Sequence, residues 1–156
     1  LLLPVFVDDN LTFCQQRFFP TKKFITKGDK TSPFMIKCGQ ATAQVVLVED
    51  FISAIRLGKH VNTICLFGVH MSSNVSKLLQ NLDMNIKIWL DNDEAGHTGA
   101  EILHNRLITI LDNCSKYKAF AVREPRTVEI IRTEKQPKDY SDEELKQILR
   151  GNNEKF

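Results

Sequence analysis

Two aspartates that are separated by one residue, Asp91 and Asp93, are the side chains of this sequence best suited to chemistry. They follow a short apolar run, residues 86–90, and precede the small pair Ala95-Gly96. Two carboxylates at this spacing on an extended chain can present oxygens to one hard divalent cation such as Mg²⁺. The alternative interpretation is structural: Asp93 or Glu94 caps the helix that follows, and Asp91 is solvated.

A third carboxylate, Glu49, follows another apolar run, residues 45–48. If these two strands are neighbours in a parallel sheet, Glu49, Asp91 and Asp93 face one crevice at the carboxyl edge of the sheet. Three convergent carboxylates repel one another, and a bound divalent cation relieves that repulsion. Such a site is typical of phosphoryl transfer, in which metal ions neutralise phosphate charge and orient the nucleophile.

The elements that must position these acids alternate between strand and helix from residue 44 onward. This order predicts an α/β fold: a mostly parallel sheet with helices on both faces. We expect strands over residues 45–48, 63–67 and 86–90, one or two more within 117–122 and 128–132, and helices over 50–57 (with Gly58 as the stop), 72–82, 95–112 and 141–150, the last begun by a capping box of Ser141 and Glu144.

Residues 1–42 have a different character, because β-prone runs at 5–7, 12–14, 17–19 and 34–36 alternate with turn residues such as Asp8-Asp9-Asn10. Six basic residues stand against one acid, Asp29, between residues 11 and 37, a local charge of +5. With phenylalanines interleaved, this segment suits contact with phosphates or single-stranded nucleic acid. The alternative is a solvated sheet face with lysine-protected edges. The basic residues are Arg17, Lys22, Lys23, Lys27, Lys30 and Lys37.

The bulk composition is that of an ordinary globular protein, with 42% hydrophobic residues and a net charge of +2, so composition alone does not indicate a nucleic-acid binder. The four cysteines and four histidines are scattered, without the spacing of a zinc site or a disulfide framework. We interpret the cysteines as reduced, mostly buried thiols of an intracellular protein. His97 is interpreted as solvent-facing, with a phosphate contact as the alternative. Residues 1–7 are too short to span a bilayer.

Together these motifs resemble the Toprim domain of primases, topoisomerases and some nucleases. The resemblance lies in Glu49 after one strand, Gly68 after the next, and the run Asp91-Asn92-Asp93-Glu94-Ala95-Gly96 after the third. Residues 89–96 and 136–144 are especially similar to DnaG-type primases of bacteria and phages. The resemblance implies a β-rich N-terminal subdomain of the catalytic core over residues 1–42, a Toprim domain over 43–135, and a C-terminal element with a short helix over 136–156.

What the resemblance implies for activity is metal-dependent nucleotidyl transfer: synthesis of short RNA primers from ribonucleoside triphosphates on single-stranded DNA, with Mg²⁺ or Mn²⁺. Glu49 is then the general base or metal organiser, Asp91 and Asp93 hold the metal, and Asp139 is an additional acid. Gly68 lets the backbone turn close to the site. Nucleotide or nucleic-acid contacts fall to Arg17, Lys22, Lys23, Lys27, Lys30 and Lys138.

The first motif departs from the common Toprim pattern Glu-Gly-x-x-Asp, because Asp50 replaces the glycine and Ser53 the second acid. Asp50 either supplies the missing carboxylate or is a first-turn acid favoured by the helix dipole, and we favour the dipole. Two other functions stay open: a Toprim metal-dependent nuclease, and a degenerate Toprim fold that binds nucleic acid without catalysis.

The sequence contains neither the cysteine and histidine spacing of a zinc ribbon nor a phosphate-binding Gly-x-x-x-x-Gly-Lys motif. We therefore expect the catalytic core of a longer phage- or plasmid-encoded primase in the cytoplasm of a bacterial host. A replicative helicase, or fused helicase and zinc-binding modules outside these residues, are its expected partners, and no membrane is involved.

Overall fold

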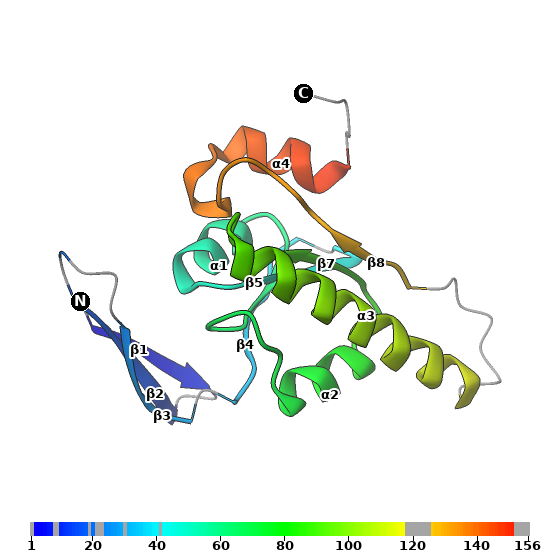
Figure 1. The fold of residues 1–156 in the computed structure, drawn as a ribbon, viewed down its shortest axis with the longest axis horizontal. Coiled ribbons are helices and arrows are strands. Elements are labelled where there is room, and N and C mark those ends of the chain that lie inside the picture. The colour runs from blue at the N-terminus through cyan, green and yellow to red at the C-terminus, as the bar shows by residue number, and fades with distance from the viewer. Residues whose placement is uncertain are drawn as a thin grey trace.

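The computed structural model describes residues 2–7, 10–18, 20, 24–29, 31–40, 42–117 and 126–151, and these form two sheets and four α-helices (Figure 1). The smaller sheet has the strand order β1-β2-β3, and the larger has the order β4-β6-β5-β7-β8. The strands are β1 (Leu2–Val7), β2 (Asn10–Arg17), β3 (Phe24–Gly28), β4 (Phe34–Ile36), β5 (Gln44–Val48), β6 (Asn62–Cys65), β7 (Asn85–Trp89) and β8 (Val128–Ile130). The helices are α1 (Phe51–Gly58), α2 (Ser73–Asn81), α3 (Glu94–Tyr117), the 3₁₀ turn η1 (Pro137–Asp139) and α4 (Asp142–Arg150).

The larger sheet confirms the predicted α/β fold. Strand β5 pairs in parallel with both β6 and β7, and β7 pairs in parallel with β8. Among the described strands of this sheet, β4 alone is antiparallel, paired with β6. The strands that precede Glu49 and Asp91 are therefore direct neighbours, as the site requires.

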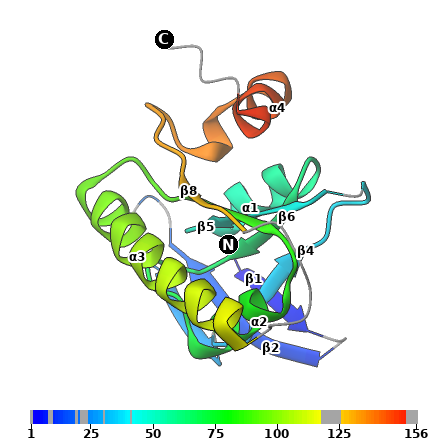
Figure 2. The ribbon, with the colours of Figure 1, turned by 90° about the vertical axis from the view of Figure 1, so that its right-hand side faces the viewer.

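Both faces of the larger sheet are covered by helices, which explains why its central strands are almost wholly apolar. Side chains of one parity, such as Val45 and Leu47, pack with α2 and α3, where Leu79 and Leu107 are buried. Side chains of the other parity, such as Val46, pack with α1 and α4. Figures 1 and 2 show α1 and α4 on one side of the sheet and α2 and α3 on the other.

Lys87 is the polar exception within β7, and its environment explains it. The side chain is buried on the α4 face, where its Nζ donates to the backbone carbonyl of Leu149 at 2.8 Å and lies 3.9 Å from the carboxylate of Glu129. A cation at the C-terminal end of a helix satisfies a carbonyl that lacks a partner within the helix. Lys87 thus fastens α4 to the sheet.

Helix boundaries agree with the prediction where a polar cap defines them. Ser72 caps α2, and Ser141 and Glu144 form the predicted capping box of α4. The helix that we predicted to stop at Gly58 ends there, with Gly58 as its buried last residue. A Cβ at this position would lie 2.5 Å from Cγ2 of Ile36, so the glycine permits close packing of α1 on β4.

Two further element predictions were inexact. The predicted strand over 63–67 ends at Cys65, because Phe67 has a left-handed backbone with φ 54°. Helix α3 runs to Tyr117, five residues beyond the prediction, so Tyr117 is helical. The rest of the strand predicted over 117–122 lies outside the described residues.

The N-terminal sheet confirms the predicted β-rich segment. Strands β1 and β2 form an antiparallel hairpin in which Val7 stands opposite Asn10. Strand β3, which we did not predict, pairs with β2. Strand β4 lies within residues 1–42 but belongs to the larger sheet. The boundary between residues 42 and 43 stays a prediction.

Candidate functional site

The carboxyl edge of the larger sheet brings Glu49 and Asp91 together. The backbone N–H of Asp91 forms a hydrogen bond with the Glu49 carboxylate. One oxygen of this carboxylate is unusual, because Glu49 Oε2 is buried and has no hydrogen-bond partner among the described residues. The turn after β6 closes the edge from the other side, where the N–H of Gly68 donates to the Glu49 carbonyl at 3.0 Å. Gly68 has φ +142°, a conformation that favours glycine.

The electrostatics of this edge are those of crowded, partly desolvated acids. Burial raises the pKa of Glu49 above its ordinary value, and the negative charges of Asp91 and Asp93 raise it further. Burial also raises the pKa of Asp91, an effect that the Lys138 ammonium opposes and that Asp50, Asp93 and Asp139 reinforce. The acids of the predicted site therefore act on one another, and a cation would lower the energy of their charged forms.

Asp93 and Asp50 both serve as helix caps. Asp93 Oδ1 accepts from the N–H of Gly96 at 2.8 Å at the start of α3. Asp50 Oδ1 accepts from the N–H groups of Ile52 and Ser53 at the start of α1. The capping interpretation of Asp93 is thus correct for this oxygen, whereas Asp50 is the N-cap of α1 and not the first-turn acid that we favoured. A capping carboxylate still has a second oxygen, so capping does not exclude metal binding.

Gly96 determines how closely α3 approaches the acidic loop. A Cβ on this residue would lie 2.1 Å from the backbone oxygen of Asp91 and 3.0 Å from its carbonyl carbon. Side chains essentially never tolerate such a distance, so only glycine fits here without displacing Asp91. Gly96 is visible in the sequence motif, but its packing role depends on a contact that forms only in the folded protein.

Residues 131–140, which we name the return segment, run from β8 back over the acidic edge. Gln136 Nε2 donates to Asp91 Oδ2 at 2.7 Å, and Lys138 Nζ lies 3.3 Å from Asp50 Oδ2. Asp139 is exposed in η1, close enough for its charge to raise the pKa of Asp91. The structure thus brings the downstream elements, Lys138 and Asp139, to the same edge as Glu49 and Asp91.

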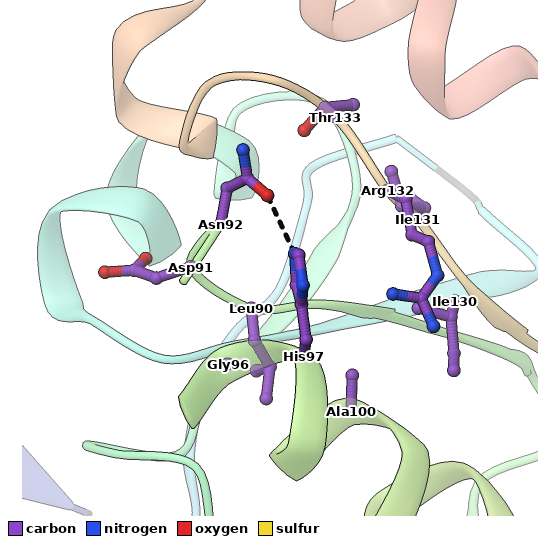
Figure 3. Close-up of a pocket in the computed structure, with 10 residues that line it drawn as sticks. All are labelled: Leu90, Asp91, Asn92, Gly96, His97, Ala100, Ile130, Ile131, Arg132 and Thr133. Atoms are coloured by element: carbon purple, nitrogen blue, oxygen red, sulfur yellow. Dashed lines mark hydrogen bonds between the residues drawn. The ribbon is translucent and has the colours of Figure 1, made fainter. Parts of the chain in front are cut away.

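Two hollows flank Asp91 and Asp93. The smaller is a cavity of about 10 Å³ beneath the return segment, with room for about one water molecule. In Figure 3, His97 and Asn92 face each other across it with a hydrogen bond of 2.7 Å, while the Asp91 carboxylate points away from them, towards α1. The larger is an open cleft of about 560 Å³ between residues 69–70 and the first turns of α3, and Asp93 lines it. The larger cleft is of a size that takes a small-molecule ligand.

The comparisons with known proteins identify this architecture. Residues 47–121 match the model of the Toprim-like family. This part of the chain is a Toprim domain. Among solved structures, the zinc-binding and RNA polymerase domains of the Aquifex aeolicus primase superpose with a TM-score of 0.65 at 16% sequence identity. The match covers 96% of this chain and 39% of that one, so the fold around the Toprim domain is that of a primase core. No protein of curated function matches the sequence.

Toprim domains generally bind divalent metal ions such as Mg²⁺, and we asked whether the residues at this edge fit one. Within the described ranges, no three His, Cys, Asp or Glu side chains lie close enough to form a metal site by themselves. Magnesium ions usually keep several waters and bind through one or two carboxylates and substrate phosphates. The unpartnered Oε2 of Glu49 beside Asp91 fits that mode of binding.

The remaining predicted contacts of the Toprim domain and its N-terminal sheet are placed only in part. Lys27 is exposed on β3, and Arg17 ends β2. Lys22, Lys23 and Lys30 lie outside the described residues. His97 is exposed, as predicted. The cysteines are less buried than predicted, because Cys65 is buried whereas Cys14 and Cys38 are partly exposed.

Gln136 is the site residue that the sequence analysis missed as such. In the sequence it is only the first residue of the stretch 136–144 that resembles primases. A glutamine carries no charge and has no characteristic spacing from Asp91, which is 45 positions away.

In the described part of the chain, no helix is long and apolar enough to cross a membrane.

Proposed function

We propose that this chain is the catalytic core of a DNA primase, which joins ribonucleoside triphosphates into short RNA primers on single-stranded DNA. The observation that carries the proposal is the buried, unpartnered carboxylate oxygen of Glu49 beside Asp91, at the carboxyl edge of a Toprim sheet. The likeness of the whole fold to a primase structure supports it.

The residues of the site have separate tasks in this proposal. Glu49 and Asp91 hold the cation, with Asp93 and Asp139 adding negative charge around it. A bound Mg²⁺ or Mn²⁺ supplies charge neutralisation at the phosphates and orients the nucleophile. The alternative role of Glu49 is that of the proton acceptor in place of a metal ligand.

Substrate contacts follow from the placement of cations and of open space. The cleft beside Asp93 offers room for a nucleotide next to the acids. Lys138, which forms an ion pair with Asp50 at the acidic edge, is the proposed phosphate contact. The template strand is assigned to the basic residues of the N-terminal segment, with Arg17 and Lys27 among the described ones. Template-reading zinc modules and a helicase are proposed as partners outside these residues.

A primer-synthesis assay tests the proposal. The full chain is incubated with single-stranded template, ribonucleoside triphosphates and Mg²⁺ or Mn²⁺, and labelled RNA products are measured. We expect Glu49→Gln and Asp91→Asn each to lower the rate by about 100-fold or more, because each removes a charge that holds the metal. Glu143→Gln, the same change at an exposed position of α4, should keep the wild-type rate.

Three outcomes would count against the proposed site or the proposed activity. Primer synthesis that survives Glu49→Gln and Asp91→Asn would mean that the site lies elsewhere. Metal-dependent cutting of DNA without incorporation of nucleotides would favour a Toprim nuclease. If calorimetric titration detected no binding of Mg²⁺ or Mn²⁺ and no product formed, the fold would be a non-catalytic member that binds nucleic acid.

A further inference from the structure

One neutral side chain reaches the acidic edge from far along the sequence. Gln136 Nε2 donates to Asp91 Oδ2 at 2.7 Å, within the range of a strong charge-assisted hydrogen bond. We propose that Gln136 is a positioning residue, which fixes the orientation of the Asp91 carboxylate for binding a divalent cation. This inference rests on the proposed metal-dependent function of the same site.

The return segment holds Gln136 from both sides. Before it, Thr133 Oγ1 accepts from Trp89 Nε1 at 2.9 Å, which ties the segment to the end of β7. After it, Pro137 is buried in η1, and the Tyr140 carbonyl accepts from Arg56 of α1 at 2.6 Å. The amide of Gln136 is therefore placed in advance and does not need to be ordered when the site is used.

Two further contacts hold the return segment close to Gln136. Lys138 Nζ lies 3.3 Å from Asp50 Oδ2, and Asn92 Nδ2 donates to the Glu134 carbonyl at 3.0 Å. Asn92 is the residue between the two aspartates, so the return segment contacts both the acidic loop and Asp50 at the start of α1. Because so many contacts anchor its segment, Gln136 is suited to orient the Asp91 carboxylate.

The Gln136 hydrogen bond aids metal binding because of how many ligands a carboxylate can accept. An ionised carboxylate has two oxygens and about four lone-pair directions, so one amide donor leaves room for a metal ion. Outer partners of metal-binding carboxylates commonly act in this way, and losing one typically lowers metal affinity 10- to 100-fold.

The test measures metal affinity in the full chain by calorimetric titration with Mn²⁺. Gln136→Leu removes the donor and keeps a similar volume. Thr133→Val removes two other hydrogen bonds of the return segment, to Trp89 and to the Lys135 carbonyl, and does not touch Asp91. We expect the dissociation constant to rise about 10-fold for Gln136→Leu and by at most roughly two-fold for Thr133→Val, because the buried Pro137 and the contacts of Tyr140 and Lys138 still hold the amide of Gln136 in place.

Trp89 provides a control for displacement of the return segment, because it is the one tryptophan of the sequence and is buried next to Thr133. Its emission in Gln136→Leu should match that of the wild type, and the melting temperature in EDTA should fall by only a few degrees, because one hydrogen bond is lost while the segment stays in place. A red shift of the emission together with the loss of affinity would mean that the segment had detached, which overturns the positioning role.

The other outcomes separate this inference from the proposed function. If the wild type binds Mn²⁺ and Gln136→Leu binds it equally well, the positioning role is overturned while the metal site stands. If Thr133→Val loses as much affinity as Gln136→Leu, general loosening of the segment is responsible, and the specific role is again overturned. If the wild type binds no Mn²⁺, both proposals fail.

Discussion

At the scale of single residues, Glu49 combines two features that stability alone would not favour. Its Oε2 is buried without a hydrogen-bond partner, and Asp91 and Asp93 repel its charge. An unpartnered buried polar atom destabilises a fold unless some ligand satisfies it. Such a residue is best explained by function, because a glutamine would suit the metal-free fold better.

We expect Glu49→Gln to make the metal-free protein more stable at neutral pH. The pKa of Glu49 is raised above its ordinary value of 4.5, so the folded state holds the proton more tightly than the unfolded chain does. The resulting penalty is absent at low pH and develops as the pH rises through 4.5 towards the raised pKa. Because water screens this half-buried group, a gain of about 1 kcal/mol or less, or about 3 °C in melting temperature, is expected.

Thermal melts in EDTA at pH 7.5 and at pH 4 measure this effect. The difference between Glu49→Gln and wild type should shrink or vanish at pH 4. Glu143→Gln removes an exposed charge from the first turn of α4, so it should not be more stable than wild type at either pH. A Glu49→Gln protein that is less stable than wild type at pH 7.5 would show that the carboxylate has a stabilising partner in the metal-free fold.

At the scale of elements, the acidic site depends on how α3 begins. Asp93 caps this helix, and Gly96 allows its first turn to lie against the backbone of Asp91. The helix start and the acidic loop are therefore one rigid unit. Two contacts secure β7 from the other side. Lys87 of this strand donates to the Leu149 carbonyl of α4, and Gln136 of the return segment donates to Asp91, just after the strand.

We expect Gly96→Ala to damage both stability and the site. Its new methyl group would meet the Asp91 carbonyl at 2.1 Å, so the loop or the helix must shift, at a cost of about 1–3 kcal/mol. Denaturant unfolding measures the stability change, and Mn²⁺ titration measures the weakened site. The matched control is Gly39→Ala, because nothing lies within 4 Å of a Cβ at that exposed position. Equal behaviour of the two variants would contradict the close-packing argument.

At the scale of the whole molecule, an aromatic cluster joins the N-terminal sheet to the Toprim domain. The rings of Phe13 on β2 and Phe67 after β6 meet edge to face, with centroids 4.7 Å apart, and Phe34 lies 5.9 Å from Phe67. Phe67 has a left-handed backbone, which a bulky residue adopts only under strain. It immediately precedes Gly68, whose N–H donates to the Glu49 carbonyl. The N-terminal sheet thus supports the turn that borders the site.

We expect Phe13→Ala to destabilise the protein by about 3–5 kcal/mol, because Phe13 is fully buried and its removal leaves a cavity. Denaturant unfolding measures this loss. The exposed Phe6→Ala on the neighbouring strand is the control and should change stability by less than about 1 kcal/mol. If Phe13→Ala were as mild as Phe6→Ala, the contact with Phe67 would contribute nothing to joining the two parts.

The sequence by itself determined the features that depend on local pattern. Apolar runs followed by acids predicted β5 and β7 with Glu49 and Asp91 at their ends, and hydroxyl residues before helices predicted the caps of α2 and α4. These predictions succeeded because hydrophobic periodicity and capping act between residues that are close in sequence. The packing of Gly58 against Ile36 was not predicted, because that contact joins residues that are distant in sequence.

The tertiary structure alone decided how the acids are arranged and supported. The sequence offered Asp91 and Asp93 as equivalent ligands, yet the fold commits one oxygen of Asp93 to the start of α3 and one oxygen of Asp91 to Gln136. It also leaves Glu49 with a buried oxygen that has no partner in the described structure. The physical reason is that a hydrogen bond across 45 positions and a burial penalty exist only after the sheet and the return segment have folded over one another.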